Sequence, residues 1–438
     1  MDIRIAAVGD CIITRSVRSE PGEAFAGLRS TIGAADLAFA NLELLPHRFE
    51  GAPAVQSGGA WLCCEPALVD ELRWLGFGIF GCAHNHVHDF GRAGLLAAMG
   101  HMDAMGVAYA GVGHNLAAAR APRYVETPAG RVALIATSAT FTVESPAGAQ
   151  RHDFPGRPGL NPLRIRRSLR VTSGELEQLR AIGEHLGLAR PRAAGTAAGA
   201  DDVLDLFGQR FVASERPGEW TEPDPADLEA NVRAVREAAR QADWVLVSLH
   251  SHESVVGDRE RPAAFAPAFA HACIDAGAHA VLGHGPHVLR GAEIYRGRPI
   301  LYSLGNFIFQ NETMTAQPDD FYRNLGVADP AAGPADLFDA RSGSGTRGFP
   351  ADRLIWEGAL AQIRLDTNGP ADVEILPVTL GFGQPRPRRG TPGLAAPADA
   401  ERIAARLDQL CRPFGARMVR AGMGWQLHPA GGIAGPAA

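Results

Sequence analysis

Five apolar segments of strand length each end at residues that can bind a metal ion, and this repeated pattern restricts the fold more than any other feature of the chain. Side chains just past the ends of neighbouring strands can meet, because paired strands lie about 4.7–4.9 Å apart. We therefore interpret the five endings as one site in a compact fold. The segments are 3–10, 36–43, 77–86, 243–250 and 279–287, and they end at Asp10, Asn41 and Glu43, Asn85 and His86, His250 and His252, and His284 and His287.

The residue types at these ends predict the kind of ion. Carboxylates, amide oxygens and imidazoles suit manganese, iron, zinc or magnesium better than a thiolate-bound structural zinc. Asp10 alone could equally cap the next turn, whereas Glu43 can bridge two ions with its two oxygens. His250 is favoured over His252 because it directly ends its apolar run. We predict one or two divalent metal ions, with the ligands Asp10, Glu43, Asn85, His250, His284 and His287.

The run HNHVHDFG, residues 84–91, packs three imidazoles, an amide and a carboxylate into a turn between a strand and a helix. Asn85 can give a neutral oxygen to a metal, which leaves His86 available for acid/base chemistry near neutral pH. Asp89 either orients His86 or caps the following helix. We predict His86 and Asp89 as catalytic residues.

Composition excludes some classes of function. The chain contains no lysine, so all 42 basic residues are arginine. It therefore lacks a Walker lysine for a nucleotide phosphate and an amine for a pyridoxal Schiff base, and we expect neither a nucleotide nor pyridoxal phosphate as cofactor. The net charge of -6 argues against a nucleic-acid partner.

The cysteines and the hydropathy of the chain bear on the cellular compartment of the protein. The six cysteines form no regular framework and no C-x-x-C pair, which suits a reducing compartment. The first residues enter an apolar strand directly, and no run approaches the roughly 18 apolar residues needed to span a bilayer. We expect a cytoplasmic protein without a membrane span.

Segments with helical spacing alternate with the strands, which indicates an α/β fold. The expected helices are 66–76, 94–106, 227–243, 262–277 and 398–411. Further strands are expected at 107–112, 131–138, 299–309, 358–366 and 371–380. About ten strands are more than one sheet usually holds, so we expect two packed mixed sheets.

The 438 residues are interpreted as one large domain, 1–380, with insertions at about 141–221 and 311–350. The second insertion is rich in Gly, Pro, Asp and Ala and is too long for a simple connection, which favours a lid or mobile loop. Residues 381–438 are expected to form a linker, a helix and a tail that pack on the same domain.

Arginines cluster at the start of the first insertion, between residues 151 and 170. They could hold carboxylates through forked hydrogen bonds, or form a solvated face that balances local acids such as Asp201, Asp202 and Asp205. We predict Arg157, Arg164 and Arg166 as substrate-binding residues.

The ordered motifs resemble one known family. GD, NLE, NH-x-x-D-x-G, LH, GHGPH and YSLGNF, together with RPGLNPLR at 157–164, are similar to motifs of the CapA, or poly-γ-glutamate capsule-synthesis (PGA_cap), family within the calcineurin-like metallophosphatase superfamily. The resemblance covers about residues 3–309.

This resemblance implies a four-layer α/β/β/α sandwich of two mixed sheets with a dinuclear metal centre. It implies Asp10, Glu43 and His287 around one ion, and Glu43, Asn85, His250 and His284 around the other, with His86 as acid/base and Asn306 near the centre in a substrate-binding position. Two motifs depart from the superfamily. Asp10 is followed by Cys11 and Ile12 rather than by Asp-x-His, and the final Gly-His-x-His is lengthened to GHGPH.

Four functions are compatible with these observations. The leading hypothesis is a metal-dependent hydrolase of an amide-linked, carboxylate-bearing chain, poly-γ-glutamate or a peptide, that uses metal-activated water. The resemblance also allows a metal-dependent Cα epimerase of a ribosomal, lasso-type peptide precursor. Phosphoester hydrolysis rests on superfamily analogy alone. A non-enzymatic capsule-synthesis scaffold is the fourth.

Overall fold

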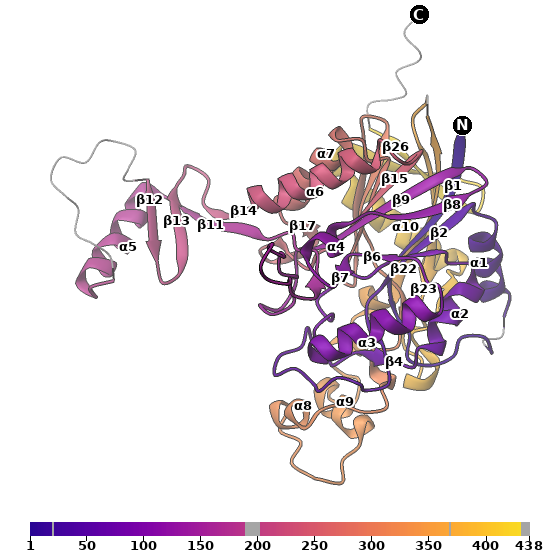
Figure 1. Cartoon of the computed structure of the whole chain (residues 1–438), viewed down its shortest axis with the longest axis horizontal. Coiled ribbons are helices and arrows are strands. Elements are labelled where there is room, and N and C mark those ends of the chain that lie inside the picture. Colours follow the sequence, from indigo (N-terminus) through magenta and orange to yellow (C-terminus); the bar gives the residue numbers. More distant parts are fainter. Residues whose placement is uncertain (20–21, 189–201, 368, 431–438) are drawn as a thin grey trace, which may run out of the picture.

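The computed structural model describes residues 1–438 except 20–21, 189–201, 368 and 431–438. The chain is a mixed α/β protein with several sheets, of which two are large (Figure 1). Among the described residues, no helix combines the length and apolar character that crossing a membrane requires.

The first large sheet has ten strands, and its main path runs β25-β26-β23-β22-β1-β2-β5-β6. Strands β21 and β24 add to it by pairing with β1 and β23. β1, β2, β5 and β6 are parallel neighbours, whereas β22 joins β1 in antiparallel orientation. The strands are β1 (Asp2–Ile12), β2 (Leu37–Leu42), β5 (Ile79–Gly81), β6 (Tyr109–Ala110), β21 (Asn306–Phe309), β22 (Glu357–Asp366), β23 (Asp372–Thr379), β24 (Gly393–Leu394), β25 (Ala416–Ala421) and β26 (Gly424–Pro429).

The second large sheet has six strands in the order β19-β20-β18-β15-β9-β8. Its centre is parallel, because β15 pairs in parallel with both β9 and β18. The strands are β8 (Arg123–Thr127), β9 (Gly130–Ser138), β15 (Trp244–His250), β18 (Ala280–His284), β19 (Leu289–Tyr295) and β20 (Arg298–Leu304).

Alternate residues of the six-stranded sheet belong to two different cores. Trp244 and Leu246 join the core that contains the ten-stranded sheet, whereas Val245 and Val247 pack in the core that contains α6 (Pro225–Ala238) and α7 (Phe265–Asp275). A strand that is buried on both faces must be apolar throughout, which explains the continuous run WVLVSL. Burying one such large side chain contributes about 1.5–3 kcal/mol.

The remaining long helices complete these cores. α1 (Glu23–Gly33), α2 (Ala67–Leu75) and α3 (Gly91–Ala104) contribute apolar side chains to the core of the ten-stranded sheet. α10 (Pro397–Cys411) contacts β19, β23 and β25, so the C-terminal segment packs on the large sheets. The helices expected from apolar spacing are confirmed, with ends shifted by a few residues.

The first insertion projects from the body of the molecule, at the left of Figure 1. We call its β11–β14 unit the arm; it comprises the described residues 165–188 and 202–223 and includes the helix α5 (Ser173–His185). The arm has its own small core of Leu176, Leu204 and Leu206. Thr172 begins α5 with a capping box that includes Glu175. The arm strands are β11 (Ile165–Val171), β12 (Val203–Leu206), β13 (Gln209–Ala213) and β14 (Gly218–Pro223).

The second insertion lies at the bottom of Figure 1 and contains short helices rather than a simple loop. These are η1 (Asn311–Thr313), α8 (Asp319–Asn324), α9 (Pro334–Ser342) and η2 (Phe349–Ala351). Short elements elsewhere complete the described chain: β3 (Leu45–Pro46), β4 (Cys63–Cys64), β7 (Val112–Gly113), α4 (Leu116–Arg120), β10 (Gly159–Leu160), β16 (Ser254–Val255), β17 (Asp258–Pro262), η3 (Arg353–Trp356), η4 (Arg386–Arg388) and η5 (Arg412–Phe414).

Three expectations about strands were wrong or incomplete. Segment 107–112 is not one strand, because Gly111 adopts φ +100° and separates β6, in the ten-stranded sheet, from β7, which pairs with β10. Segment 299–309 is not one strand, because Gly305 adopts φ +68° and sends β20 and β21 into different sheets. The residues after α10 were expected only as a tail, but they contain β25 and β26, which form a hairpin that joins β23.

The side chain of His279 should make the free energy of unfolding depend on pH. Its Nδ1 accepts a hydrogen bond from the backbone N–H of Val245 at 3.1 Å, and burial, with a smaller effect of Arg298, lowers its pKa to about 4. The unfolded chain binds a proton at His279 as pH falls from about 6.5, but the folded chain does not. We expect a stability loss on the order of 1–2 kcal/mol between pH 6.5 and pH 4.

Urea unfolding of the metal-free protein across this pH range measures the effect. His279→Asn keeps an acceptor for Val245 and removes the titration, so its stability should fall less steeply than that of the wild type. Parallel pH profiles for the two proteins would contradict this assignment.

Candidate metal centre

Strands from both large sheets end at one place. In the ten-stranded sheet Asp10 of β1 is the register partner of Asn41 of β2, and in the six-stranded sheet His250 of β15 is the partner of His284 of β18. β1 also contacts β18 and β20 across the two sheets. The carboxyl ends of the two parallel pairs therefore face each other, and their polar side chains form one cluster.

A local irregularity aims Asp10 into this cluster. The register of β1 against β2 shifts between Ala7 and Asp10, which re-directs the side chains that follow. Gly9 permits this, because a Cβ there would lie 1.9 Å from the carbonyl oxygen of Gly305. That carbonyl accepts a hydrogen bond from the Asp10 N–H at 3.0 Å. The Asp10 carboxylate accepts hydrogen bonds from Asn41 Nδ2 at 2.8 Å and Gly285 N at 2.9 Å.

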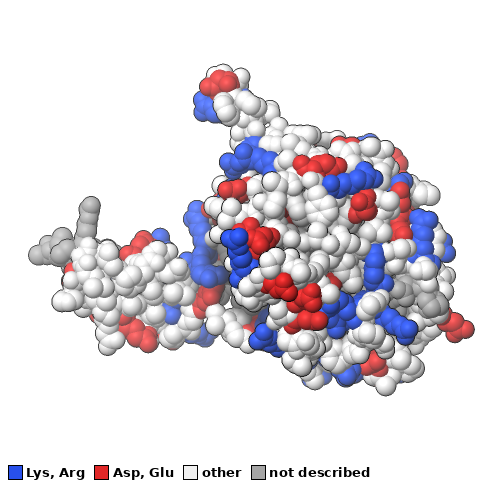
Figure 2. All heavy atoms as spheres, turned by 90° about the horizontal axis from the view of Figure 1, so that it is seen from below, with Lys and Arg blue, Asp and Glu red and all other residues white. Residues whose placement is uncertain are grey.

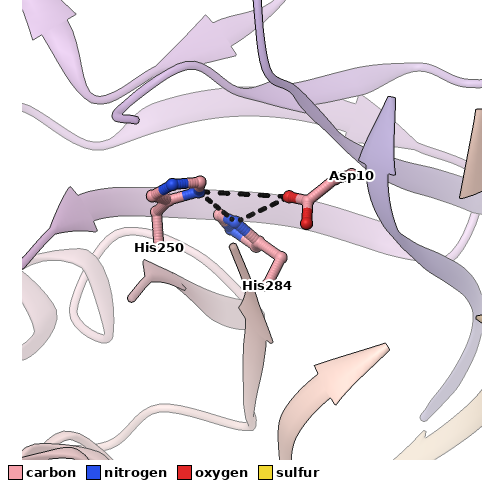
Figure 3. A group of neighbouring side chains, drawn as sticks. All are labelled: Asp10, His250 and His284. Atoms are coloured by element: carbon pink, nitrogen blue, oxygen red, sulfur yellow. Dashed lines mark hydrogen bonds and ion pairs between the residues drawn. The ribbon is translucent and has the colours of Figure 1, made fainter. Parts of the chain in front are cut away.

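His250, His284 and Asp10 point toward one another (Figure 3). His250 also contacts further members of the cluster. Its Nδ1 lies 3.1 Å from His284 Nδ1 and 4.0 Å from Asp10 Oδ1, and His284 Nδ1 lies 3.6 Å from the same oxygen. Its Nε2 lies 3.0 Å from the side-chain oxygen of Asn85. Ser248 holds the other ring nitrogen of His284, because its Oγ lies 2.7 Å from His284 Nε2.

Glu43 is the most unusual member of the cluster. Its side chain is fully buried, and neither carboxylate oxygen has a hydrogen-bond partner among the described residues. Oε1 lies 3.7 Å from His287 Nε2 and 3.8 Å from His250 Nε2. A buried carboxylate without partners is costly, so this position requires a proton or a cation.

Burial shifts every titratable group of the cluster toward its neutral form. It raises the pKa of Asp10 to about 6 and that of Glu43 well above its usual range, and for Glu43 the nearby Asp10 charge adds to the effect. Burial lowers the pKa of His284 to about 3 and that of His287 to about 4. The imidazoles are therefore neutral at physiological pH, which is the form that binds metals.

Asn306 holds His287 in place. Its Oδ1 lies 2.9 Å from His287 Nδ1, and its Nδ2 donates to the carbonyls of His287 and Ile355 at 3.3 and 2.8 Å. His287 has φ +58°, a strained conformation for a residue with a side chain, and this turns the ring toward Asp10 and Glu43. Substrate binding by Asn306 stays a prediction, while the observed contacts give it a positioning role.

The turn at 84–91 places an imidazole beside the cluster. His86 Nδ1 lies 2.7 Å from Asp89 Oδ2, and this oxygen also accepts a hydrogen bond from Leu62 N at 2.8 Å. Asp89 does not cap α3, whose first residues have no side-chain cap. Of the two roles expected for Asp89, the structure shows the orientation of His86.

Three groups of side chains could each hold a metal ion. Asp10, Glu43 and His250 each belong to two of them, and all the ligand atoms within a group lie within 4.8 Å of one another. The groups are Asp10, His250 and His284; Glu43, His250 and His252; and Asp10, Glu43 and His287. Asn85, the remaining predicted ligand, joins the cluster through its contact with His250.

The observed separations suit a shared ion. Two donor atoms bound about 2.1 Å from one metal lie roughly 3.0–3.4 Å apart at tetrahedral or octahedral angles. Nδ1 of His250 approaches Nδ1 of His284 at 3.1 Å, which falls within this range. The contacts of His250 with His252 at 3.2 Å and with Asn85 at 3.0 Å involve its other ring nitrogen, and a neutral imidazole binds a metal through only one of the two. The unpartnered carboxylate, the neutral imidazoles and these distances together fit one or two divalent cations.

Asn41 and His252 were among the strand-end residues assigned to the site, but neither was included in the predicted ligand set. His252 Nε2 lies 3.2 Å from His250 Nε2, and Asn41 directs its amide to Asp10 while its Oδ1 has no partner among the described residues. The spacing of two residues in HSH was a usable signal, because it places both imidazoles on the same side of an extended chain.

The three predicted substrate-binding arginines lie on the first insertion and already have partners. Arg164 pairs with Asp227 at 2.9 Å, Arg166 with Asp224 at 3.2 Å, and Arg157 donates to the carbonyl of Pro146 at 3.1 Å. The alternative interpretation, a solvated face that balances local acids, fits the exposed Arg166 with Asp224, whereas Arg164 pairs with the buried Asp227.

The fold and the cluster define a class: a mixed α/β protein with a buried His, Asp and Glu site that could bind metal ions. Residues 4–311 match the family described as "Bacterial capsule synthesis protein PGA_cap". The chain belongs to this family, as its motifs predicted.

The chain is also similar to individual proteins, which match different shares of its length. The chain is 35% identical over 429 residues to "Uncharacterized protein y4sH" of Sinorhizobium fredii, which covers 94% of this chain and 90% of that protein. It is 39% identical over 109 residues to "PGA biosynthesis protein CapA" of Bacillus subtilis, covering 24% of this chain and 26% of that protein. It is 28% identical over 187 residues to "Capsule biosynthesis protein CapA" of Bacillus anthracis, covering 41% and 35%.

The unpartnered carboxylate of Glu43 predicts opposite effects of one substitution with and without metal. In chelator-treated protein, Glu43→Gln should be as stable as the wild type or more so, because a neutral amide removes the buried acid. With Mn²⁺ at about 100 times its dissociation constant, the wild type should gain about 2.7 kcal/mol and the variant much less.

Thermal unfolding with and without Mn²⁺ measures both effects. Glu253→Gln, an acidic residue near the same strand end whose carboxylate already accepts hydrogen bonds from Thr140 and Ser251, is the control and should retain the metal response. Equal stabilisation of wild type and Glu43→Gln by Mn²⁺ would show that Glu43 does not bind the ion.

Proposed function

We propose that the protein is a metal-dependent hydrolase of an amide-linked, carboxylate-bearing chain, poly-γ-glutamate or a peptide. The observation that carries the proposal is Glu43, a fully buried carboxylate without a partner among the described residues, surrounded by neutral imidazoles. The names of the relatives, which refer to PGA and capsule biosynthesis, support the choice of substrate class.

The proposal includes the finer architecture and the ligand set. We infer a metallophosphatase-like α/β/β/α sandwich, which the two separate cores and the convergence of strand ends support. The ligands are proposed to be Asp10, Glu43, Asn85, His250, His284 and His287, with His252 as a further candidate. Bound there, a divalent ion supplies Lewis acidity and lowers the pKa of a bound water.

The residues around the site perform the remaining tasks. His86 is the proposed acid/base, because Asp89 holds its Nδ1 and so directs the opposite ring nitrogen away from that carboxylate. His86 is also close enough to Asp10 to lower the pKa of that carboxyl group. Asn306 and Ser248 orient His287 and His284, as outer partners of metal-binding imidazoles do.

Removal of predicted ligands tests the hydrolase. Asn85→Ala combined with His284→Ala should abolish both bound metal and cleavage of γ-glutamyl oligomers or peptides, measured by elemental analysis and mass spectrometry. His185→Ala, at the exposed end of the arm helix, is the control and should change neither. Unchanged cleavage by the double variant would refute the metal-site mechanism.

A substitution of His86 tests whether this residue acts in acid/base catalysis rather than in metal binding. His86→Gln should lower kcat by roughly a hundredfold or more while the metal content stays the same, because general acid/base catalysis contributes about 10²–10⁴. Steady-state kinetics on the metal-loaded variant provides the measurement, and loss of metal with loss of activity would instead make His86 a ligand.

A second candidate function is epimerisation at a Cα centre of a peptide precursor. One imidazole beside the cluster favours it: His86, whose Nδ1 lies 2.7 Å from Asp89 Oδ2, is oriented for acid/base chemistry. His86 could exchange the Cα proton at such a centre, while a metal ion bound in the cluster would polarise the adjoining carbonyl.

Incubation with peptides in heavy water distinguishes the two reactions. Epimerisation predicts deuterium at Cα in an intact chain, whereas hydrolysis predicts shorter chains without it. Absence of deuterium from every intact peptide that the protein binds would eliminate the epimerase.

A further inference from the structure

A cavity of about 140 Å³ opens in the second insertion, where η1, α9 and η2 meet. Aromatic side chains form part of its wall, and charged side chains reach into it. The residues that matter here are Asn311, Glu312, Phe338, Arg341, Arg347 and Phe349. This cavity is distinct from the metal cluster, and the proposed function does not use it.

Arg341 is half-buried, and the charge of Glu312 acts on it from beyond ion-pair distance. No described carboxylate lies within ion-pair distance of its guanidinium, and no described residue accepts a hydrogen bond from it. The guanidinium lies 5.5 Å from the ring centres of both Phe321 and Phe349, which hold it in place. Glu312, the acid on the cavity wall, is already paired with Arg389. The cavity therefore has unbalanced positive charge.

Asn311 adds an independent signal. Its side chain is 5% exposed and lines the same cavity, yet its Oδ1 has no hydrogen-bond partner among the described residues. A buried acceptor without a donor is costly, so a ligand that offers an N–H would be favoured here. A carboxylate for Arg341 and an N–H for Asn311 are the two groups that an amide-linked acidic chain carries.

The cavity adjoins the most open side of the metal cluster. His287 is 9% exposed, more than the other five predicted ligands, and its ring lies 5.8 Å from that of Phe349. Phe349 thus lies between His287 and Arg341. The insertion is fastened to the loop before β4, because Gln317 exchanges hydrogen bonds with the backbone of Trp61 at 3.1 and 2.8 Å.

The surrounding surface does not offer a broad positive field. Figure 2 views the molecule from the side of this insertion, and basic and acidic side chains are interspersed across the face. A single arginine in a cavity can recognise one carboxylate at a fixed place, whereas a mixed surface cannot select an acidic chain.

We propose that this cavity is a substrate subsite, in which Arg341 binds a side-chain or α-carboxylate of an amide-linked acidic chain and Asn311 accepts an N–H from the adjoining amide. The inference rests on the proposed function for the identity of the ligand, and it places the specificity for acidic chains on the second insertion. Arg341 and Asn311 would position the chain so that a neighbouring bond reaches the metal cluster beside His287.

Calorimetric binding to the metal-loaded full-length protein tests the subsite without requiring turnover. The probes are tetra-γ-glutamate, α-linked tetraglutamate, and the same two oligomers with every carboxylate converted to a carboxamide. The wild type should bind at least one acidic oligomer roughly tenfold to a hundredfold more tightly than its amidated form, the range of a charge-assisted hydrogen bond.

Arg341→Met removes the charge but keeps a long side chain between Phe321 and Phe349, and it should abolish this preference without changing the metal content. Arg323→Met is the matched control, because Arg323 is an exposed arginine of the same insertion that pairs with Asp319, and it should keep the preference. Asn311→Ala should weaken binding of acidic and amidated oligomers alike, since it removes the amide acceptor.

The outcomes separate the two claims. A wild-type protein without preference for the acidic oligomers, or an Arg341→Met variant that keeps it, would overturn the subsite even if metal-dependent cleavage is observed. A preference that depends on Arg341 in a protein without cleavage would support the subsite while contradicting the hydrolase.

Discussion

Two buried carboxylates at the junction of two sheets are the constraint on which the rest of this structure depends. Asp10 and Glu43 are both fully buried, and Glu43 has no partner among the described residues. Negative charge in such a place is stable only beside cations, and the described neighbours are neutral imidazoles. The strand register, the bulge before Asp10 and the strained backbone at His287 all serve to bring these groups together.

The cluster is built from residues at and just past strand ends, and part of the second insertion lies beside it. Three of the six predicted ligands, Asp10, His250 and His284, lie in strands. Glu43, Asn85 and His287 lie in the loops just past strand ends. The second insertion lies over the side of His287 and is fastened to Trp61. Variation in such surface segments is a general way in which one fold comes to serve several reactions. The arm, with a core of its own, is the part least tied to the centre.

Much of the fold could be predicted from the sequence, because buried parallel strands such as WVLVSL leave an unambiguous apolar run. The grouping of ligands followed from strand ends, since parallel neighbours end at the same edge. The break at Gly305 was missed because apolar residues continue through it, and only its φ of +68° separates β20 from β21. The hairpin of β25 and β26 was missed although Gly422 and Gly424 flank a short turn between two alternating segments. The partners of Arg164 and Arg166 could not be foreseen, because Asp224 and Asp227 lie far along the chain.

Anomalous diffraction from crystals of the protein, collected at the absorption edge of the metal found by elemental analysis, tests the central claim most directly. The account predicts one or two peaks within bonding distance of Asp10, Glu43 and His250. A fully metal-equilibrated crystal with no peak among these side chains would contradict it.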